Sequence, residues 1–162
     1  IVHFFFSTII SGIEDVAYSA GYNIIITQSN ESFAREATNI KALFNSRVDG
    51  MLISLSRETS TFDHIENMLA KGVPMVFFDR VYDNGNSSMV IVDDLSGARE
   101  ATRHLIEQGS KRIAHLKGPS ALVISQQRYQ GFKDAMDEAN RRIEDQYVLE
   151  CPIGTIEEGK EA

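Results

Sequence analysis

Asp79 and Arg80 directly follow residues 73–78 (VPMVFF), an apolar run with the composition of a buried strand. A carboxylate at the carboxyl end of a strand can accept hydrogen bonds from two hydroxyl groups, as recognition of a polyol requires, or it can hold a neighbouring arginine in place. Ligands of α/β proteins bind at this end of the sheet. The position leaves both roles open, and Asp79 is a candidate ligand-binding residue.

Arg128 is a second candidate, in the motif SQQRYQGF at the start of a predicted amphipathic helix over residues 126–140. A cation in the first turns of a helix opposes the helix macrodipole, so helix stability does not explain this residue. A guanidinium group there is well placed to reach across a cleft to an acceptor. We therefore interpret Arg128 as a candidate ligand-binding residue.

Consecutive aromatic residues precede the first predicted helix, in the stretch HFFF at residues 3–6. Their rings can stack on a sugar or a base, or they can fill the core beneath the helix. Phe5 and Phe6 are candidates for the first role, and the spacing leaves both roles open.

Asp93 and Asp94 stand immediately before the predicted helix LSGAREATRHL. A carboxylate at this place satisfies free backbone N–H groups and lies at the positive end of the helix. We expect a capping role for this pair in preference to direct ligand contact.

The elements that must position these residues alternate along the whole chain. Helix periodicity marks residues 7–20, 33–46, 62–71, 95–108 and 126–140, and short apolar runs predict strands at 22–27, 50–55, 73–78, 89–92 and 112–116. Such alternation predicts the α/β class, with doubly wound parallel sheets and right-handed crossovers.

Two lobes are expected. Residues 1–92 form an N-terminal lobe whose first strand is largely missing, and residues 93–162 form the first part of an incomplete C-terminal lobe, with the change of lobe near Asp93. The final stretch GTIEEGKEA predicts the beginning of another helix.

Composition excludes several classes of function. The net charge of −7 and pI near 5.1 argue against this segment gripping nucleic acid, which needs clustered Lys and Arg. Cys151 is the only cysteine, so we expect a free, buried thiol and a reducing compartment, the cytoplasm. The apolar first ten residues are too short to span a bilayer and lack the features of an export signal, so no membrane association is expected.

Motifs for catalysis are missing as well. The sequence contains neither GxGxxG nor GxxxxGK[ST], and its four histidines are far apart and outside any HExxH spacing. It has no GxSxG elbow, and Cys151 has no partner nearby in the sequence. We therefore expect a binding module with no cofactor and no metal, not an enzyme.

A long stretch of the sequence resembles a known family. VIVDDLSGAREATRHLIEQGSKRIAHLKGPSALVISQQRYQGFKDAM is similar, almost end to end, to the core signature of the lactose-repressor/galactose-repressor family. FFSTIISGIEDVAYSAGYNIIITQSN, RVDGMLIS and VPMVFFDR resemble earlier parts of that family's sensor. The resemblance covers nearly the whole chain, although Val2-His3-Phe4 replaces the usual Asn-Pro and Ser110 replaces a usual histidine.

The resemblance implies a periplasmic-binding-protein-like sensor that holds an effector, here expected to be a sugar or a sugar-like metabolite, between two lobes. It implies a homodimer that binds a DNA operator through an N-terminal helix-turn-helix headpiece absent from this sequence. In that family's pattern Phe5 and Phe6 match the aromatic pair that flanks the ligand, Asp79 the strand-end carboxylate and Arg128 the arginine of the opposing lobe, while Asp93 marks the crossover. The alternative is a periplasmic sugar receptor of the same fold.

Overall fold

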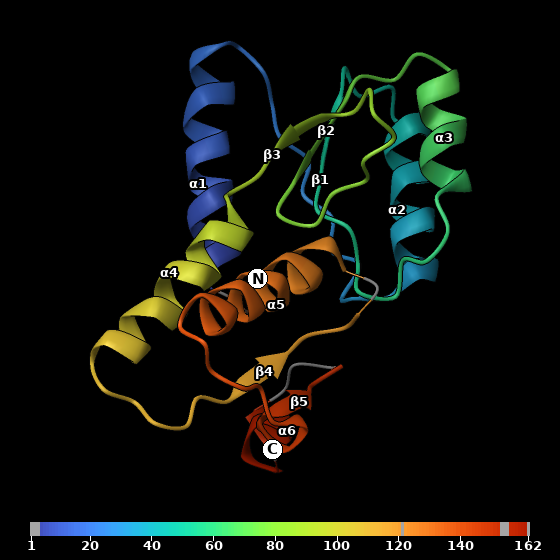
Figure 1. The fold of residues 1–162 in the computed structure, drawn as a ribbon. Helices are drawn as coiled ribbons and strands as arrows, with labels where there is room; N and C mark the ends of the chain where they lie inside the picture. The colour runs from blue at the N-terminus through green and yellow to red at the C-terminus, as the bar shows by residue number, and fades with distance from the viewer. Residues whose placement is uncertain (1–3, 121, 153–155, 162) are drawn as a thin grey trace.

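The computed structural model describes residues 4–120, 122–152 and 156–161. Within these ranges the strands form two parallel sheets, of order β1-β2-β3 and β4-β5, and helices alternate with the strands along the chain (Figure 1). The elements are α1 (Phe4–Ser19), α2 (Phe33–Asn45), β1 (Met51–Ile53), α3 (Asp63–Ala70), β2 (Met75–Phe78), β3 (Ser88–Val90), α4 (Asp94–Glu107), β4 (His115–Lys117), α5 (Val123–Glu138), the 3-10 helix η1 (Asp145–Tyr147), β5 (Val148–Glu150) and α6 (Ile156–Glu161).

The first sheet has a well-packed core on one face. In β1, Met51 and Ile53 are buried and Leu52 between them is exposed, and in β2 Phe77 is fully buried. Helices α2 and α3 cover this face (Figure 1), as their apolar stripes predict. The buried members of this core are Ile40, Met51, Ile53, Leu55, Ile65, Met68, Met75 and Phe77.

The opposite face of the first sheet is exposed. Leu52 and Val90, on the outer strands, keep more than half of their surface accessible. Helix α1 lies on this side of the sheet (Figure 1), yet none of its residues is buried. The predicted helix over 7–20 is therefore present and begins three residues earlier, but its apolar face is only partly covered.

The prediction of a strand over residues 22–27 is wrong. This segment pairs with no strand in the described part of the chain, and it is exposed along its whole length, with Ile25 at 58%. An apolar, β-branched run favours extended backbone, but a strand also needs the hydrogen bonds of a neighbouring chain. In the described residues β1 pairs with β2 on one side, and residues 22–27 do not pair with its other edge.

Helices α4 and α5 form the tightest contact of the second half, and Gly131 makes it possible. A Cβ atom at this position would lie 2.1 Å from the carbonyl oxygen of Leu95 and 3.1 Å from the Cβ of Ala98. Only glycine allows the two backbones to approach so closely. The core beside this crossing contains Ile113, Phe132 and Met136, and β4 pairs with β5 in the register His115↔Val148.

Other boundaries differ little from the predictions. Helix α5 begins at Val123, three residues ahead of the predicted start, which moves Arg128 into its second turn. The pair η1 and β5 was not predicted, whereas α6 agrees with the helix expected at the end of the sequence. A lobe boundary between residues 92 and 93 falls between the two sheets and remains a prediction.

Candidate functional site

Asp79 lies where expected, immediately after β2 at the carboxyl end of the first sheet. Its backbone is in the left-handed region, with φ of 59°, which is uncommon for a residue other than glycine and best tolerated by Asp and Asn. Burial raises the pKa of its carboxyl group, against the lowering effects of the Arg80 and Arg128 charges, and the nearby Asp94 raises the pKa further. A carboxylate so placed accepts hydrogen bonds in a partly desolvated site.

Arg80, the next residue, is bound through both terminal nitrogens by a residue that the sequence did not single out. Its two terminal nitrogens donate to the two carboxylate oxygens of Glu31, at 2.5 and 3.0 Å. Asp79 Oδ2 lies 3.7 Å from Arg80 Nε, so the expected contact between these neighbours is the weaker one. The Arg80 side chain is only 10% exposed.

Glu31 also binds the loop that follows β1. The backbone N–H of Arg57 donates to Glu31 Oε2 at 2.9 Å, and Arg57 Nε lies 3.8 Å from Oε1. Burial raises the pKa of Glu31, but the hydrogen bonds from Arg80 and Arg57 and the two positive charges together lower it below its ordinary value. The signal that could have found Glu31 is its place in the loop after the predicted strand 22–27, although it lies four residues beyond that strand whereas Asp79 follows its strand directly.

Arg128 is positioned by Asp94 on the neighbouring helix. Arg128 Nε donates to Asp94 Oδ1 at 2.6 Å. Asp94, the first residue of α4, is buried, whereas the Arg128 side chain is 53% exposed. Within the described residues its two terminal nitrogens make no hydrogen bond, so they remain available to a ligand.

The two aspartates before α4 have different surroundings. Asp93 caps the helix, since its Oδ1 accepts a hydrogen bond from the Ser96 N–H at 2.9 Å, and this bond lowers the pKa of Asp93. Asp94 is in the first turn, where the helix macrodipole favours a negative charge, and it is also the partner of Arg128.

The aromatic pair lies in the first turn of α1, beside Phe78 at the end of β2. The Phe6 ring is half-buried, and its centroid lies 6.3 Å from that of Phe78, edge to face. The Phe5 ring contacts Phe6 at 5.2 Å and is 54% exposed. His3, the first residue of the HFFF stretch, lies outside the described residues.

A buried carboxylate fixes the loop after β1. Glu36 in α2 is 5% exposed and accepts hydrogen bonds from the Ser56 N–H at 2.5 Å and the Thr59 hydroxyl at 2.8 Å. Its Oε1 also lies 2.9 Å from His64 Nε2. The sequence analysis missed this residue, although its spacing from Ile40 places a charge on the apolar face of the helix. Glu36 therefore orders the loop that carries Arg57.

Two cavities lie at opposite ends of the first sheet. A small one of about 60 Å³ lies between the loop after β1, the residues after β2 and the start of α5. It is lined by Leu55, Ser56, Thr59, Phe62, Arg80, Val81, Leu122, Val123 and Ile124. Its walls come from both halves of the chain, so the two sheets approach each other at the carboxyl ends of β1 and β2.

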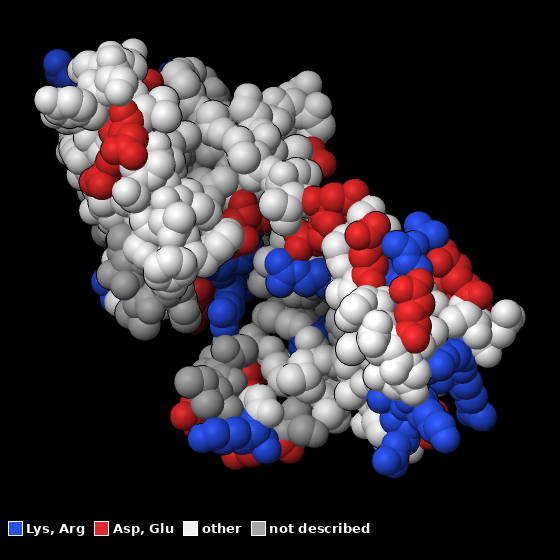
Figure 2. Space-filling model, turned by 90° about the vertical axis from the view of Figure 1, so that its left-hand side faces the viewer, with Lys and Arg blue, Asp and Glu red and all other residues white. Residues whose placement is uncertain are grey.

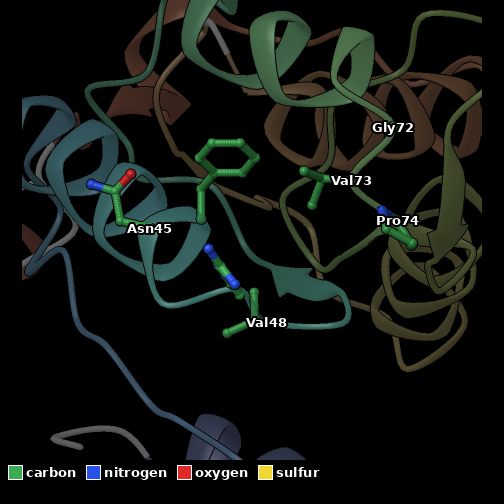
Figure 3. Close-up of a pocket in the computed structure, with 7 residues that line it drawn as sticks. Asn45, Val48, Gly72, Val73 and Pro74 are labelled. Atoms are coloured by element: carbon green, nitrogen blue, oxygen red, sulfur yellow. The ribbon is translucent and has the colours of Figure 1, made fainter.

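The larger cavity, of about 390 Å³, is at the other end of the first sheet (Figure 3). Asn45 and Val48 line it from the end of α2, and Val73 and Pro74 line it from the segment before β2. These are the amino ends of the strands, away from Asp79, and Arg47 is the only charged residue among those that line it. The candidate site is therefore the edge with Asp79, Arg80 and Arg128.

Charges of both signs lie on the face of the molecule that carries α1. Figure 2, which looks at the face that carries α1, shows few charged side chains over the upper part of the molecule and intermixed acidic and basic side chains around the hollow below it. The described residues contain no cluster of three or more His, Cys, Asp or Glu side chains that could hold a metal ion. Nor does any helix of the described residues have the length and apolar character needed to cross a bilayer.

Comparison with known proteins gives the class. Residues 2–162 match the family model described as periplasmic binding proteins and sugar binding domain of LacI family, and the chain belongs to this family. The predicted resemblance and the periplasmic-binding-protein-like fold are thus confirmed.

Particular relatives are transcriptional repressors. The ribose operon repressor of Halalkalibacterium halodurans is 35% identical over 83% of this chain and 39% of its own length, and the repressor PurR of Vibrio vulnificus is 33% identical over 90% and 43%. The crystal structure of a putative ribose operon repressor from Burkholderia thailandensis has a TM-score of 0.86 at 29% identity, over 93% of this chain and 56% of that one. The chain spans about two-fifths of the length of these curated relatives. Their names agree with the prediction of a non-enzymatic module.

Proposed function

We propose that this chain is the effector-sensing part of a bacterial transcription regulator, and that it binds a sugar between its two lobes. The observation that carries the proposal is the pair Asp79 and Arg128. Asp79 follows β2 of the first sheet and Arg128 lies on α5 in the second half of the chain, yet Arg128 is close enough to lower the pKa of Asp79. A polyol between them donates its hydroxyl hydrogens to the carboxylate and accepts hydrogen bonds from the free guanidinium nitrogens. Phe5 supplies an exposed ring that contacts Phe6, which in turn packs against Phe78, the residue before Asp79.

The coupling to DNA follows from the same geometry. A ligand that contacts residues of both lobes favours one relative arrangement of these lobes, and it shifts the equilibrium only by its difference in affinity for the two arrangements. An N-terminal helix-turn-helix headpiece, a homodimeric assembly and action in the cytoplasm complete the proposal. The relatives named as repressors support a regulator over a transport receptor.

The test uses the full-length protein and a sugar chosen as the monosaccharide that most raises its melting temperature in a screen. Arg128→Ala removes the free donors, and loss of charged hydrogen bonds of about 1.5–3 kcal/mol lowers the affinity roughly 10- to 100-fold by calorimetry. Arg103→Ala is the matched control, because Arg103 has a similar exposure but pairs only with acidic residues of its own helix, Glu100 and Glu107.

Two results would contradict the proposal. One is a screen in which no sugar raises the melting temperature. The other is an Arg128→Ala protein that keeps its circular dichroism spectrum and binds the sugar as tightly as the Arg103→Ala control.

A further inference from the structure

The arginines at the candidate site differ in what they can still bind. Arg80 lines the small cavity between the two halves of the chain, but both of its terminal nitrogens are bound to Glu31. Glu31 also accepts a hydrogen bond from the backbone N–H of Arg57, and the Arg57 guanidinium group lies close to its carboxylate. One carboxylate thus binds both terminal nitrogens of Arg80 and also lies near the charge of Arg57.

Glu31 occupies the place that a bound anion would take. A guanidinium fork binds a carboxylate and a phosphate with the same two parallel hydrogen bonds, so Glu31 covers the Arg80 fork as a phosphate would. With Glu31 in position, a phosphate group can reach the Arg80 fork only by displacing the carboxylate. If it binds beside the carboxylate instead, electrostatic repulsion between the two negative charges weakens its binding. A neutral hydroxyl group meets neither obstacle.

The backbone of Glu31 shows that this placement is imposed. Asn30 and Glu31 both have left-handed backbone, with φ of 49° and 65°. Such a conformation costs about 1 kcal/mol or more for a residue other than glycine, and it persists only where surrounding contacts hold it. Those contacts are the Arg80 fork and the Arg57 N–H.

We propose that Glu31 determines ligand specificity: it makes the site select neutral, unphosphorylated sugars by closing the Arg80 fork against phosphate. The proposal rests on the proposed function for the sugar, but the fork and its closure are features of the first sheet alone. Removing the charge of Glu31 frees the terminal nitrogens of Arg80 beside the cavity. The terminal nitrogens of Arg80 can then bind a phosphate group.

The experiment compares the full-length wild type with Glu31→Gln, whose amide keeps the shape of the side chain and can still accept the Arg57 N–H. Inorganic phosphate is the anionic probe, and the sugar from the screen is the neutral one. By calorimetry, Glu31→Gln binds phosphate at least about tenfold more tightly than wild type, because the fork is free for a charge-assisted pair. The double variant Glu31→Gln/Arg80→Gln loses this gain.

Glu58→Gln is the matched control, because Glu58 is adjacent to Arg57 in the sequence and, among the residues that the structure describes, accepts a hydrogen bond only from the Phe33 N–H, at 3.0 Å. It removes one negative charge without freeing a fork, so it gains no phosphate binding. A gain equal to that of Glu31→Gln would overturn the proposal, as would a folded Glu31→Gln protein with no gain.

The wild type gives an independent test that needs no variant. It binds the unphosphorylated sugar at least about tenfold more tightly than the phosphate ester of the same sugar, and equal affinities would overturn the proposal. The outcomes separate the two proposals. A phosphate gain in Glu31→Gln without any sugar binding rejects the proposed function alone, whereas sugar binding without a phosphate gain rejects the role of Glu31 alone.

Discussion

Two ion pairs belong to the candidate site, and they use the same chemistry in opposite ways. In the first sheet, Glu31 binds both terminal nitrogens of Arg80, and the arginine is 10% exposed. In the second half, Asp94 binds only Nε of Arg128, and the arginine is 53% exposed. In the first pair both terminal nitrogens of the arginine are bound to the carboxylate, whereas in the second pair the carboxylate binds Nε and, within the described residues, leaves the terminal nitrogens free for a ligand.

The difference comes from where the carboxylate is attached. Glu31 reaches Arg80 from a loop with left-handed backbone, and its longer side chain meets the fork end-on. Asp94 is fixed in the first turn of α4, and its short side chain meets Arg128 from the side, so the fork stays directed outward. An ion pair at a binding site is thus informative only when the donor nitrogens that it uses are known.

The largest expected effect is on stability, and it comes from disrupting the crossing of α4 and α5. This crossing positions Arg128 against Asp94. Gly131→Ala places a methyl group 2.1 Å from the Leu95 carbonyl oxygen, so α4 and α5 must move apart. We expect a loss of about 3 kcal/mol in the free energy of unfolding, measured with urea. Gly97→Ala in α4 is the control, because nothing lies within 4 Å of its added methyl group and helix propensity favours alanine. Equal stability of the two variants would contradict the close crossing.

A smaller effect tests the contrast between the arginines directly. Arg80→Ala leaves Glu31 without its two charged donors, and we expect it to lower the free energy of unfolding by about 2 kcal/mol. Arg128→Ala costs about 1 kcal/mol or less, because Asp94 keeps the favourable field of the α4 N-terminus. Urea unfolding of both variants measures the difference. If Arg128→Ala proves the more destabilising, the assignment of a structural role to Arg80 and a binding role to Arg128 is reversed.

The smallest effect concerns the pH dependence of sugar binding. Burial raises the pKa of Asp79, so this carboxylate is protonated at a higher pH than an ordinary aspartate. Affinity for the sugar therefore falls as the pH is lowered through this raised pKa, because protonation removes charge and one acceptor. Calorimetry from neutral to acidic pH follows the fall.

Asp79→Asn is the control for this titration, since Asn also tolerates left-handed backbone. It binds the sugar weakly at every pH. A carboxyl group whose pKa is higher in the folded than in the unfolded state disfavours folding when ionised, so the variant is no less stable at neutral pH. Identical pH profiles for the variant and the wild type would exclude Asp79 as the titrating group.

Much of the fold was predictable from local pattern. Helical spacing identified α2, α3, α4 and α5 to within a few residues, because α2, α3 and α5 each bury apolar residues at helical spacing, although the buried residues of α4 are the polar Asp94 and Thr102. The segment 22–27 was not predictable in this way. Its composition suits a strand, but strand formation depends on a partner that is distant in the sequence.

At the site, the sequence pointed to Asp79 and Arg128 because strand ends and helix starts are local features. It did not reveal Glu31 or Glu36 as partners. Glu31 and Arg80 are 49 positions apart, and Glu36 and Ser56 are 20 apart. Pairing of charges at such distances is set by the packing of α2 and α3 on the first sheet, not by any local signal.

The sequence by itself determined which residues are candidates at this edge: Asp79 after a buried strand and Arg128 at the start of a helix. Only the tertiary structure decided which arginine is free. Residue type fixes the charge and the number of donors, and local periodicity fixes the element. Whether those donors are already bound depends on the carboxylates that the fold brings within 3 Å of them, Glu31 for Arg80 and Asp94 for Arg128.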